Sequence, residues 1–185
     1  MRPIRSWMLA CVVVTAALAA TVPRPARAAS AAELNRESAA ALRDLYAKQT
    51  SARVLGDRAA GILVFPGIYK AGFMFGGAIG EGVLRRNGRV AGYYNSVAAS
   101  YGFQAGIQKF GYALFFMNNA ALQQLDATAG FELGVGPSIV VVDEGIGKSI
   151  TSNTITSDVY AFIFDQKGLM AGIGIQGSKI TRISK

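Results

Sequence analysis

The sequence predicts an α+β fold in a single domain: a glycine-rich, mainly antiparallel β-sheet or barrel with an N-terminal amphipathic helix and one internal helix. Three observations lead to this prediction. Apolar side chains recur at helical spacing over residues 30–59. All 22 glycines lie between Gly56 and Gly177, and all but Gly56 follow that stretch. In that region, short runs rich in Val, Ile, Phe and Tyr alternate with turn signals, which is typical of strands.

Residues 1–28 have the organisation of a secretory signal peptide of the bacterial kind. Arg2 and Arg5 precede an apolar stretch, and Ala26-Arg27-Ala28 has the form of a cleavage site. We expect cleavage there, a mature domain over 29–185, and a periplasmic or cell-envelope location. A retained membrane anchor is the alternative, although the apolar stretch is short for a membrane span.

The mature chain has 157 residues and a net charge of +4, because four of the 19 basic residues leave with the signal peptide and all 11 acidic residues stay. This mild charge allows attraction to an anionic surface, but no dense basic run indicates nucleic acid. The mature chain has no histidine and no cysteine, which excludes Cys-ligated zinc, thiol catalysis and Ser-His-Asp triads. Lipidation at Cys11 is disfavoured because most of the apolar stretch follows it.

The N-terminal helix is expected over residues 30–59. Ser30 can cap it, with Glu33 completing a capping box. Arg36 and Arg43 lie opposite one broad face, which comprises Leu34, Ser38, Ala41, Leu42, Leu45 and Tyr46. This face either docks on the core or lies on a membrane, and the mixed charges of the polar face are weak support for lipid binding. A second helical piece is expected over Ser51–Ala60, with Val54 and Leu55 inward.

Strands follow, connected by recognisable turns. Asn87-Gly88 is a strong hairpin signal and 165–168 is a second turn. Asn118 can cap the internal helix over Asn119–Asp126, and Asp143–Asp158 is expected to be a long loop. The expected strands are Gly61–Phe65, Ala71–Arg85, Arg89–Asn95, Ser100–Lys109, Gly111–Met117, Phe131–Val142, Asp158–Phe164 and Leu169–Gln176.

The stretch GFMFGGAIGEG over 72–82 places small residues at alternate positions, so one face of that strand is nearly bare while the other is largely bulky. Glycine weakens a strand, so the repeat needs a reason. Either a helix or second sheet packs closely on the bare face, or the strand bends strongly at bulges. The same spacing recurs at 134/136 and 172/174.

No catalytic or phosphate-binding motif fits. Gly147-Lys148-Ser149 lacks the first glycine of a Walker loop, where Val142 stands. Gly80-x-Gly82 lacks the last glycine of a dinucleotide fingerprint. Asp143-Glu144 is best interpreted as a solvated turn. We therefore expect neither enzymatic activity nor a cofactor, unless folding brings separate carboxylates together.

Basic residues around the hairpin turn are the remaining candidate site. Arg85, Arg86 and Arg89 lie within five residues, and Lys70 precedes the glycine-rich strand. One interpretation is a sheet edge kept soluble by charge. The other is an anion site for lipid headgroups, to which each basic residue contributes about 1 kcal/mol near an anionic surface.

Several blocks resemble the SYLF domain in sequence and in order. They are AAGILVFPGIYKAGFMFGGAIGEGVL at 59–84, YGFQAGIQKFGYALFFMN at 101–118, FELGVGP at 131–137 and GLMAGIGIQG at 168–177. The likeness extends over about residues 30–183. One departure is GYYNSV at 92–97, where many members have a tryptophan and a proline.

The resemblance implies a non-enzymatic lipid-binding module. Animal and fungal SYLF proteins associate with phosphoinositide membranes through an N-terminal amphipathic helix and basic residues, and some fungal members bind actin. The matching positions are Lys70 in the motif and, by region only, Arg36 and Arg43. We expect binding to anionic lipid, whereas a secreted chain is not expected to meet actin. A structural or partner-binding envelope protein and a small outer-membrane β-barrel are the alternatives; the two helices and the short strands argue against the barrel.

Overall fold

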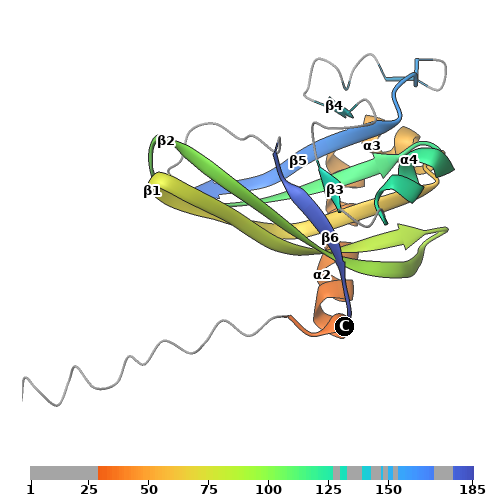
Figure 1. Cartoon of the computed structure of the whole chain (residues 1–185). Helices are drawn as coiled ribbons and strands as arrows, with labels where there is room; N and C mark the ends of the chain where they lie inside the picture. Colours follow the sequence, from red (N-terminus) through yellow and green to blue (C-terminus); the bar gives the residue numbers. More distant parts are fainter. Residues whose placement is uncertain are drawn as a thin grey trace, which may run out of the picture.

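The computed structural model describes the chain as far as residues 29–126, 130–132, 139–142, 147, 150–151, 154–168 and 177–185, without the side chains of 73–75, 100–105 and 168. The expected signal peptide and the expected strand Leu169–Gln176 lie outside the described residues. So do Asp143-Glu144, half of the expected loop, and the glycines at 134/136 and 172/174. The described part is a mixed α+β fold with one curled sheet and three helices (Figure 1).

Two of the described helices begin where the capping residues predict. Helix α2 (Ala31–Lys48) has Ser30 as its N-cap, whose Oγ accepts a hydrogen bond of 3.2 Å from the amide of Glu33. Helix α3 (Thr50–Gly56) ends four residues earlier than expected, as the chain enters the sheet. Helix α4 (Asn119–Gln124) begins at Asn118, whose Oδ1 accepts from the amide of Ala121 at 2.7 Å. No helix in the described ranges combines the length and apolar character needed to cross a membrane.

The sheet is organised around one very long hairpin. Strands β1 (Gly61–Arg86) and β2 (Arg89–Phe116) pair antiparallel along their whole length, from Gly61 opposite Phe116 to Arg86 opposite Arg89. The predicted turn is confirmed, because Asn87 and Gly88 both have positive φ, at 49° and 75°. The prediction of five shorter strands here is wrong, because the backbone pairing continues through irregularities instead of ending at them.

Shorter strands complete the sheet, in the order β3-β6-β2-β5-β4, with β1 also on β2. Strands β5 (Val159–Gly168) and β6 (Lys179–Ile183) both pair antiparallel with β2, beside different halves of it. Strand β3 (Phe131–Glu132) pairs with β6, and β4 (Ile139–Val141) runs parallel to β5.

Three expectations about these shorter strands are corrected. The expected strand at 131–142 is two short strands at opposite edges of the sheet. The expected turn at 165–168 is part of β5, where Asp165 adopts a positive φ of 50° at an irregularity in the pairing with β2. Strand β6 was not predicted.

The long hairpin bends back on itself, which accounts for the bare glycine face. A Cβ atom placed on Gly82 would lie 2.7 Å from Cδ1 of Phe65, and one on Gly80 would lie 2.5 Å from the carbonyl oxygen of Gly67. The second half of β1 therefore closely approaches its own first half (Figure 1). The expected close approach is confirmed, but the partner is the same strand rather than a helix or second sheet. A pairing irregularity between Gly72 and Met74 accompanies the bend.

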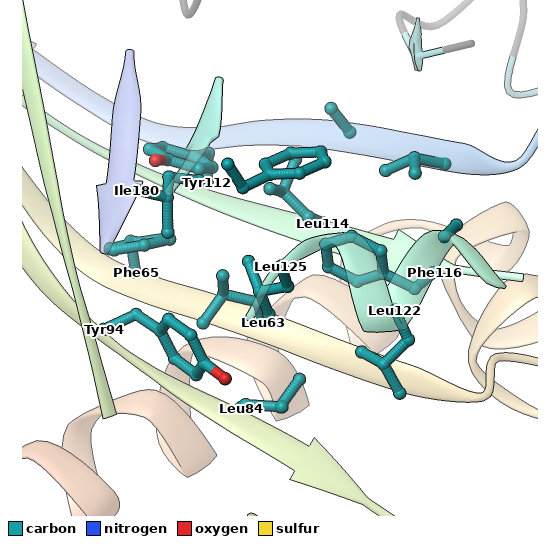
Figure 2. Close-up of a cluster of buried hydrophobic side chains, with 14 of the residues drawn as sticks. Leu63, Phe65, Leu84, Tyr94, Tyr112, Leu114, Phe116, Leu122, Leu125 and Ile180 are labelled. Carbon is teal, nitrogen blue, oxygen red and sulfur yellow. The ribbon is translucent and has the colours of Figure 1, made fainter. Parts of the chain in front are cut away.

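Two apolar clusters hold the curl together. The first fills its interior, where side chains from β1, β2, β6 and α4 converge (Figure 2): Leu63, Phe65, Leu84, Tyr94, Tyr112, Leu114, Phe116, Leu122, Leu125 and Ile180. The second lies on the outer face, where α2 and α3 cover alternate residues of β1, β2 and β5, including Val64, Phe115 and Phe162. The apolar face of α2 thus docks on the sheet, with Leu34 and Leu45 buried.

Candidate functional site

The structure separates the six basic residues singled out from the sequence. Two are exposed on α2, three surround the hairpin turn, and one lies on β1 near the bend: Arg36 and Arg43, then Arg85, Arg86 and Arg89, then Lys70. Lys70 lies in the first half of β1, on the other side of the irregularity between Gly72 and Met74 from Arg85 and Arg86. Arg43 is close enough to Arg85 for its charge to act there, but the six basic candidates do not form one compact site.

Arg85 is occupied by helix α2. Its Nη2 donates to the carbonyl oxygen of Asn35 at 2.9 Å and to Oγ of Ser38 at 3.4 Å, and its Nη1 donates to the carbonyl oxygen of Gly88 at 3.4 Å. Burial, followed by the nearby charge of Arg43, lowers the pKa of Arg85. Its guanidinium thus holds the hairpin turn against the helix, which leaves it little capacity for an external anion.

Arg86 and Arg89 are exposed at the tip of the hairpin, opposite each other in the strand register. Nη2 of Arg86 donates to Oδ1 of Asn119 at the start of α4, at 3.1 Å. These two guanidiniums are open to solvent and remain candidates for an anionic surface.

A second surface, which the sequence reasoning did not single out, lies on the outer face of the hairpin near the bend. Four large apolar side chains are exposed there, at 54% for Tyr69, 55% for Ile79, 46% for Val97 and 70% for Ile107. Directly opposite residues share one face of a sheet, and the register places Ile79 opposite Val97, Gly77 opposite Ala99 and Ala71 opposite Ile107. We call this set the hairpin stripe: Tyr69, Ala71, Gly77, Ile79, Val97, Ala99 and Ile107.

Exposed lysines border the hairpin stripe. Lys109 lies opposite Tyr69, with its Nζ 5.1 Å from the ring centroid, a distance at which a cation is attracted to an aromatic face. Lys167 on β5 pairs with Lys109, and Lys179 on β6 pairs with Val97. The surface therefore combines an apolar centre with positive edges.

A pocket of about 650 Å³ separates the hairpin stripe from the N-terminal half of α2. Tyr69 and Ile79 of the stripe contribute to its wall. Its other lining includes Glu33, Leu34, Glu37, Pro66, Gly67, Gly80, Glu81, Asn95, Lys109 and Ile183. The Oδ1 atom of Asn95 is buried and has no hydrogen-bond partner. Folding thus brings three carboxylates to one pocket, which the sequence alone could not show.

The end of the chain closes one side of this pocket. Nζ of Lys185 donates to Oε2 of Glu81 at 2.7 Å and to the carbonyl oxygen of Ala29 at 2.7 Å. The C terminus consequently lies beside the start of α2 (Figure 1). In the described ranges, no group of His, Cys, Asp or Glu side chains is arranged to hold a metal ion.

Comparison with known proteins assigns the second half of the chain to a family. Residues 97–185 match the family model Ysc84, described as "Las17-binding protein actin regulator". No curated protein matches the chain. The matched region contains most of the resembling blocks, whereas the block at 59–84 precedes it. Ysc84 is the SYLF domain, a family of binding domains rather than a known enzyme family. Residues 97–185 therefore match the SYLF domain family, to which the sequence blocks also point.

Proposed function

We propose that this protein is a non-enzymatic membrane-binding module that docks the hairpin stripe on an anionic lipid surface. The observation that carries the proposal is the exposure of Tyr69, Ile79, Val97 and Ile107 on one face of a preformed sheet. Soluble monomers rarely expose large contiguous apolar patches, and those that do commonly use them for binding. The family supports a lipid- or actin-related binding role.

The physical chemistry of the hairpin stripe suits the boundary between water and lipid. Each half-exposed aliphatic or aromatic side chain gains about 1 kcal/mol when its remaining surface leaves water. Each of Lys109, Lys167 and Lys179 adds about 1 kcal/mol near an anionic leaflet. Because the strands are already paired, docking orders little additional chain.

The helix is a weaker candidate for membrane insertion than the sheet. Leu34 and Leu45, from the apolar face of α2, are buried, and Leu45 belongs to the second cluster. Inserting that face would require the helix to leave the sheet and break the contacts between Arg85 and Asn35. Arg36 and Arg43 on the exposed face could still add long-range attraction.

We also propose that residues 1–28 direct secretion and that the protein works at the bacterial envelope. The support is the sequence pattern of a charged start, an apolar stretch and an A-x-A site. The family description names an actin regulator, but a secreted chain would be separated from actin. A protein partner docked on the hairpin stripe, in an envelope-structural role, is the second candidate function, because an exposed apolar face suits a protein as well as a lipid.

Liposome co-sedimentation tests the proposal. Purified protein should sediment with vesicles that contain phosphatidylglycerol, and the variant Ile79→Ser/Val97→Ser/Ile107→Ser should stay in the supernatant. Val90→Ser is the matched control, because Val90 is an exposed valine near the hairpin tip, away from the stripe. Equal sedimentation of the triple variant and the unmodified protein would rule out docking through the stripe. Lipid-independent capture of an envelope protein through the same residues would support the partner-binding alternative instead.

A further inference from the structure

We propose that the pocket between α2 and the hairpin stripe binds a phosphoethanolamine headgroup, which is a primary ammonium joined to a phosphodiester. This inference rests on the proposed docking at a lipid surface and names the headgroup that is selected there. It follows from the chemistry of the pocket wall, the position of Lys109 and the continuity of the pocket with the stripe.

The pocket wall formed by α2 carries two carboxylates, those of Glu33 and Glu37. Glu33 and Glu37 are four residues apart and therefore lie on the same side of the helix, where two like charges destabilise it slightly. In the part of the chain that the structure describes, neither carboxylate has an ion-pair partner, whereas Glu81 is paired with Lys185. Two carboxylates consequently face the pocket without an ion-pair partner among the described residues.

The opposing strands add two polar side chains to the same pocket. Asn95 lies directly opposite Glu81 in the register, so both side chains point from the outer face of the sheet into the pocket. The Oδ1 atom of Asn95 is itself buried, so a ligand in the pocket meets the rest of this polar side chain. The carboxylates of Glu33 and Glu37 are the acceptors that face the pocket, and they favour a ligand that is positively charged and also donates several hydrogen bonds. A primary ammonium meets both requirements.

The far side of the pocket has the opposite charge. Lys109 lines it from β2, and its side chain passes over Gly67, where an added Cβ would lie 2.8 Å from its Cε. Glycine at 67 therefore leaves space for the lysine to reach the ring of Tyr69 at the rim. An ammonium near α2 and a phosphodiester near Lys109 would match the two walls of the pocket.

The acyl chains also have a defined place. Tyr69 and Ile79 belong to both the pocket wall and the hairpin stripe, so a headgroup in the pocket leaves its lipid tails beside the exposed apolar face. A headgroup with only negative charge would meet Glu33 and Glu37 unfavourably. A phosphocholine headgroup has the same net charge as phosphoethanolamine but offers no N–H donor.

The test titrates the protein with soluble glycerophosphoethanolamine and glycerophosphocholine, and follows backbone amide shifts by NMR. We expect the ethanolamine compound to bind roughly tenfold more tightly, because the choline compound cannot donate a charged hydrogen bond. The shifts should centre on Asn95, Glu81 and the start of α2. Glu33→Gln/Glu37→Gln should remove the preference, and Glu132→Gln, an exposed carboxylate on β3, is the matched control.

A parallel arm separates this inference from the proposed function. Two kinds of vesicle have the same phosphatidylglycerol content, and the rest of their lipid is either phosphatidylethanolamine or phosphatidylcholine. The Glu33→Gln/Glu37→Gln variant should bind both kinds equally, whereas the unmodified protein should prefer the ethanolamine vesicles. Equal affinity of the unmodified protein for both headgroups would overturn the headgroup assignment alone. A preference that survives in the double variant would overturn the pocket as its site, and no binding to any vesicle would overturn the proposed function as well.

Discussion

Individual glycines decide whether the long hairpin can close on itself. Gly82 faces the ring of Phe65 and Gly80 faces the backbone of Gly67, both within the same strand. Gly77, from the same glycine-rich stretch, faces outward and has only the carbonyl oxygen of Ala98 near its missing Cβ, at 3.6 Å. Neighbouring glycines thus have different physical reasons to be there.

Gly82→Val should destabilise the protein by about 1–3 kcal/mol, because the new side chain overlaps a buried ring that has no space to move. Gly77→Val is the control, and its unfolding free energy should change by less than about 0.5 kcal/mol, as is usual at exposed positions. Urea denaturation monitored by circular dichroism measures both. Equal effects of the two substitutions would contradict the close approach of the two halves of β1.

Tyr112 links pH to stability. Its hydroxyl is fully buried and donates to Oγ of Ser96 at 2.7 Å, and burial raises the pKa of Tyr112 above its usual value of 10.0. A raised folded-state pKa stabilises the fold fully below the unfolded pKa, and this stabilisation is lost as pH rises above about 10. Burial and Asp126 raise the pKa of Tyr94 in the same direction.

The free energy of unfolding should therefore fall above about pH 10, and Tyr112→Phe should reduce the steepness of that fall. Urea titrations at a series of alkaline pH values measure it, with Tyr69→Phe, at an exposed tyrosine, as the control. An unchanged slope in Tyr112→Phe would show that this hydroxyl is not buried in the folded protein.

At the scale of elements, the main question is what holds α2 on the sheet. Arg85 bonds to the backbone of Asn35, and Nδ2 of Asn35 donates to the hydroxyl of Tyr93 at 2.9 Å. Leu34 and Leu45 of the same helix are also buried. These contacts make the helix part of the scaffold and leave the hairpin stripe as the free apolar surface.

Arg85→Met should cost about 1–3 kcal/mol of stability, since it removes the charged hydrogen bond that joins the hairpin to the backbone of α2. Arg89→Met, at an exposed arginine of the same turn, should be nearly neutral. Thermal unfolding measures the difference. The structural role assigned to Arg85 fails if both variants melt at the same temperature.

The elements that local chemistry encodes were predicted well from the sequence. Ser30 and Asn118 cap helices, and Asn87-Gly88 forms the hairpin turn, because each depends on a few neighbouring residues. The length of β1 and β2 was not predicted, because Pro66-Gly67 reads locally as a break although strand pairing carries the chain through it. Strand β6 was missed because its five residues include three polar ones and gain their place from pairing with β2.

The candidate site was less predictable for a similar reason. Val83 and Ile79 lie on the same outer face of β1, yet Val83 is fully buried and Ile79 is 55% exposed. The bulky odd positions of β1 were visible in the sequence. Which of them stay exposed depends on how far α2 extends over the sheet, and this is a tertiary property. The charges were visible as well, but not their separation between the hairpin tip and the bend.

At the scale of the whole molecule, binding should combine an apolar and an electrostatic contribution. The expected mature net charge of +4 is modest, and the lysines around the hairpin stripe concentrate part of it where the apolar side chains are exposed. Docking should then weaken with salt but persist in part, because screening reduces only the electrostatic contribution.

Lys109→Gln/Lys167→Gln/Lys179→Gln should flatten the salt dependence of liposome binding, while Arg86→Gln/Arg89→Gln should leave most of it in place. Sedimentation across a series of salt concentrations measures the two slopes. If the arginine variant flattened the salt dependence more than the lysine variant did, the hairpin tip would be the docking surface.

The most direct test of docking through the hairpin stripe uses the absence of cysteine from residues 29–185. A single cysteine is introduced as Ile107→Cys, or as Arg43→Cys on the exposed face of α2, and labelled with an environment-sensitive fluorophore. On addition of phosphatidylglycerol vesicles, the dye at position 107 should shift to the blue as it enters the lipid, and the dye at position 43 should not. A shift at position 43 with none at position 107 would contradict docking through the sheet and assign it to the helix.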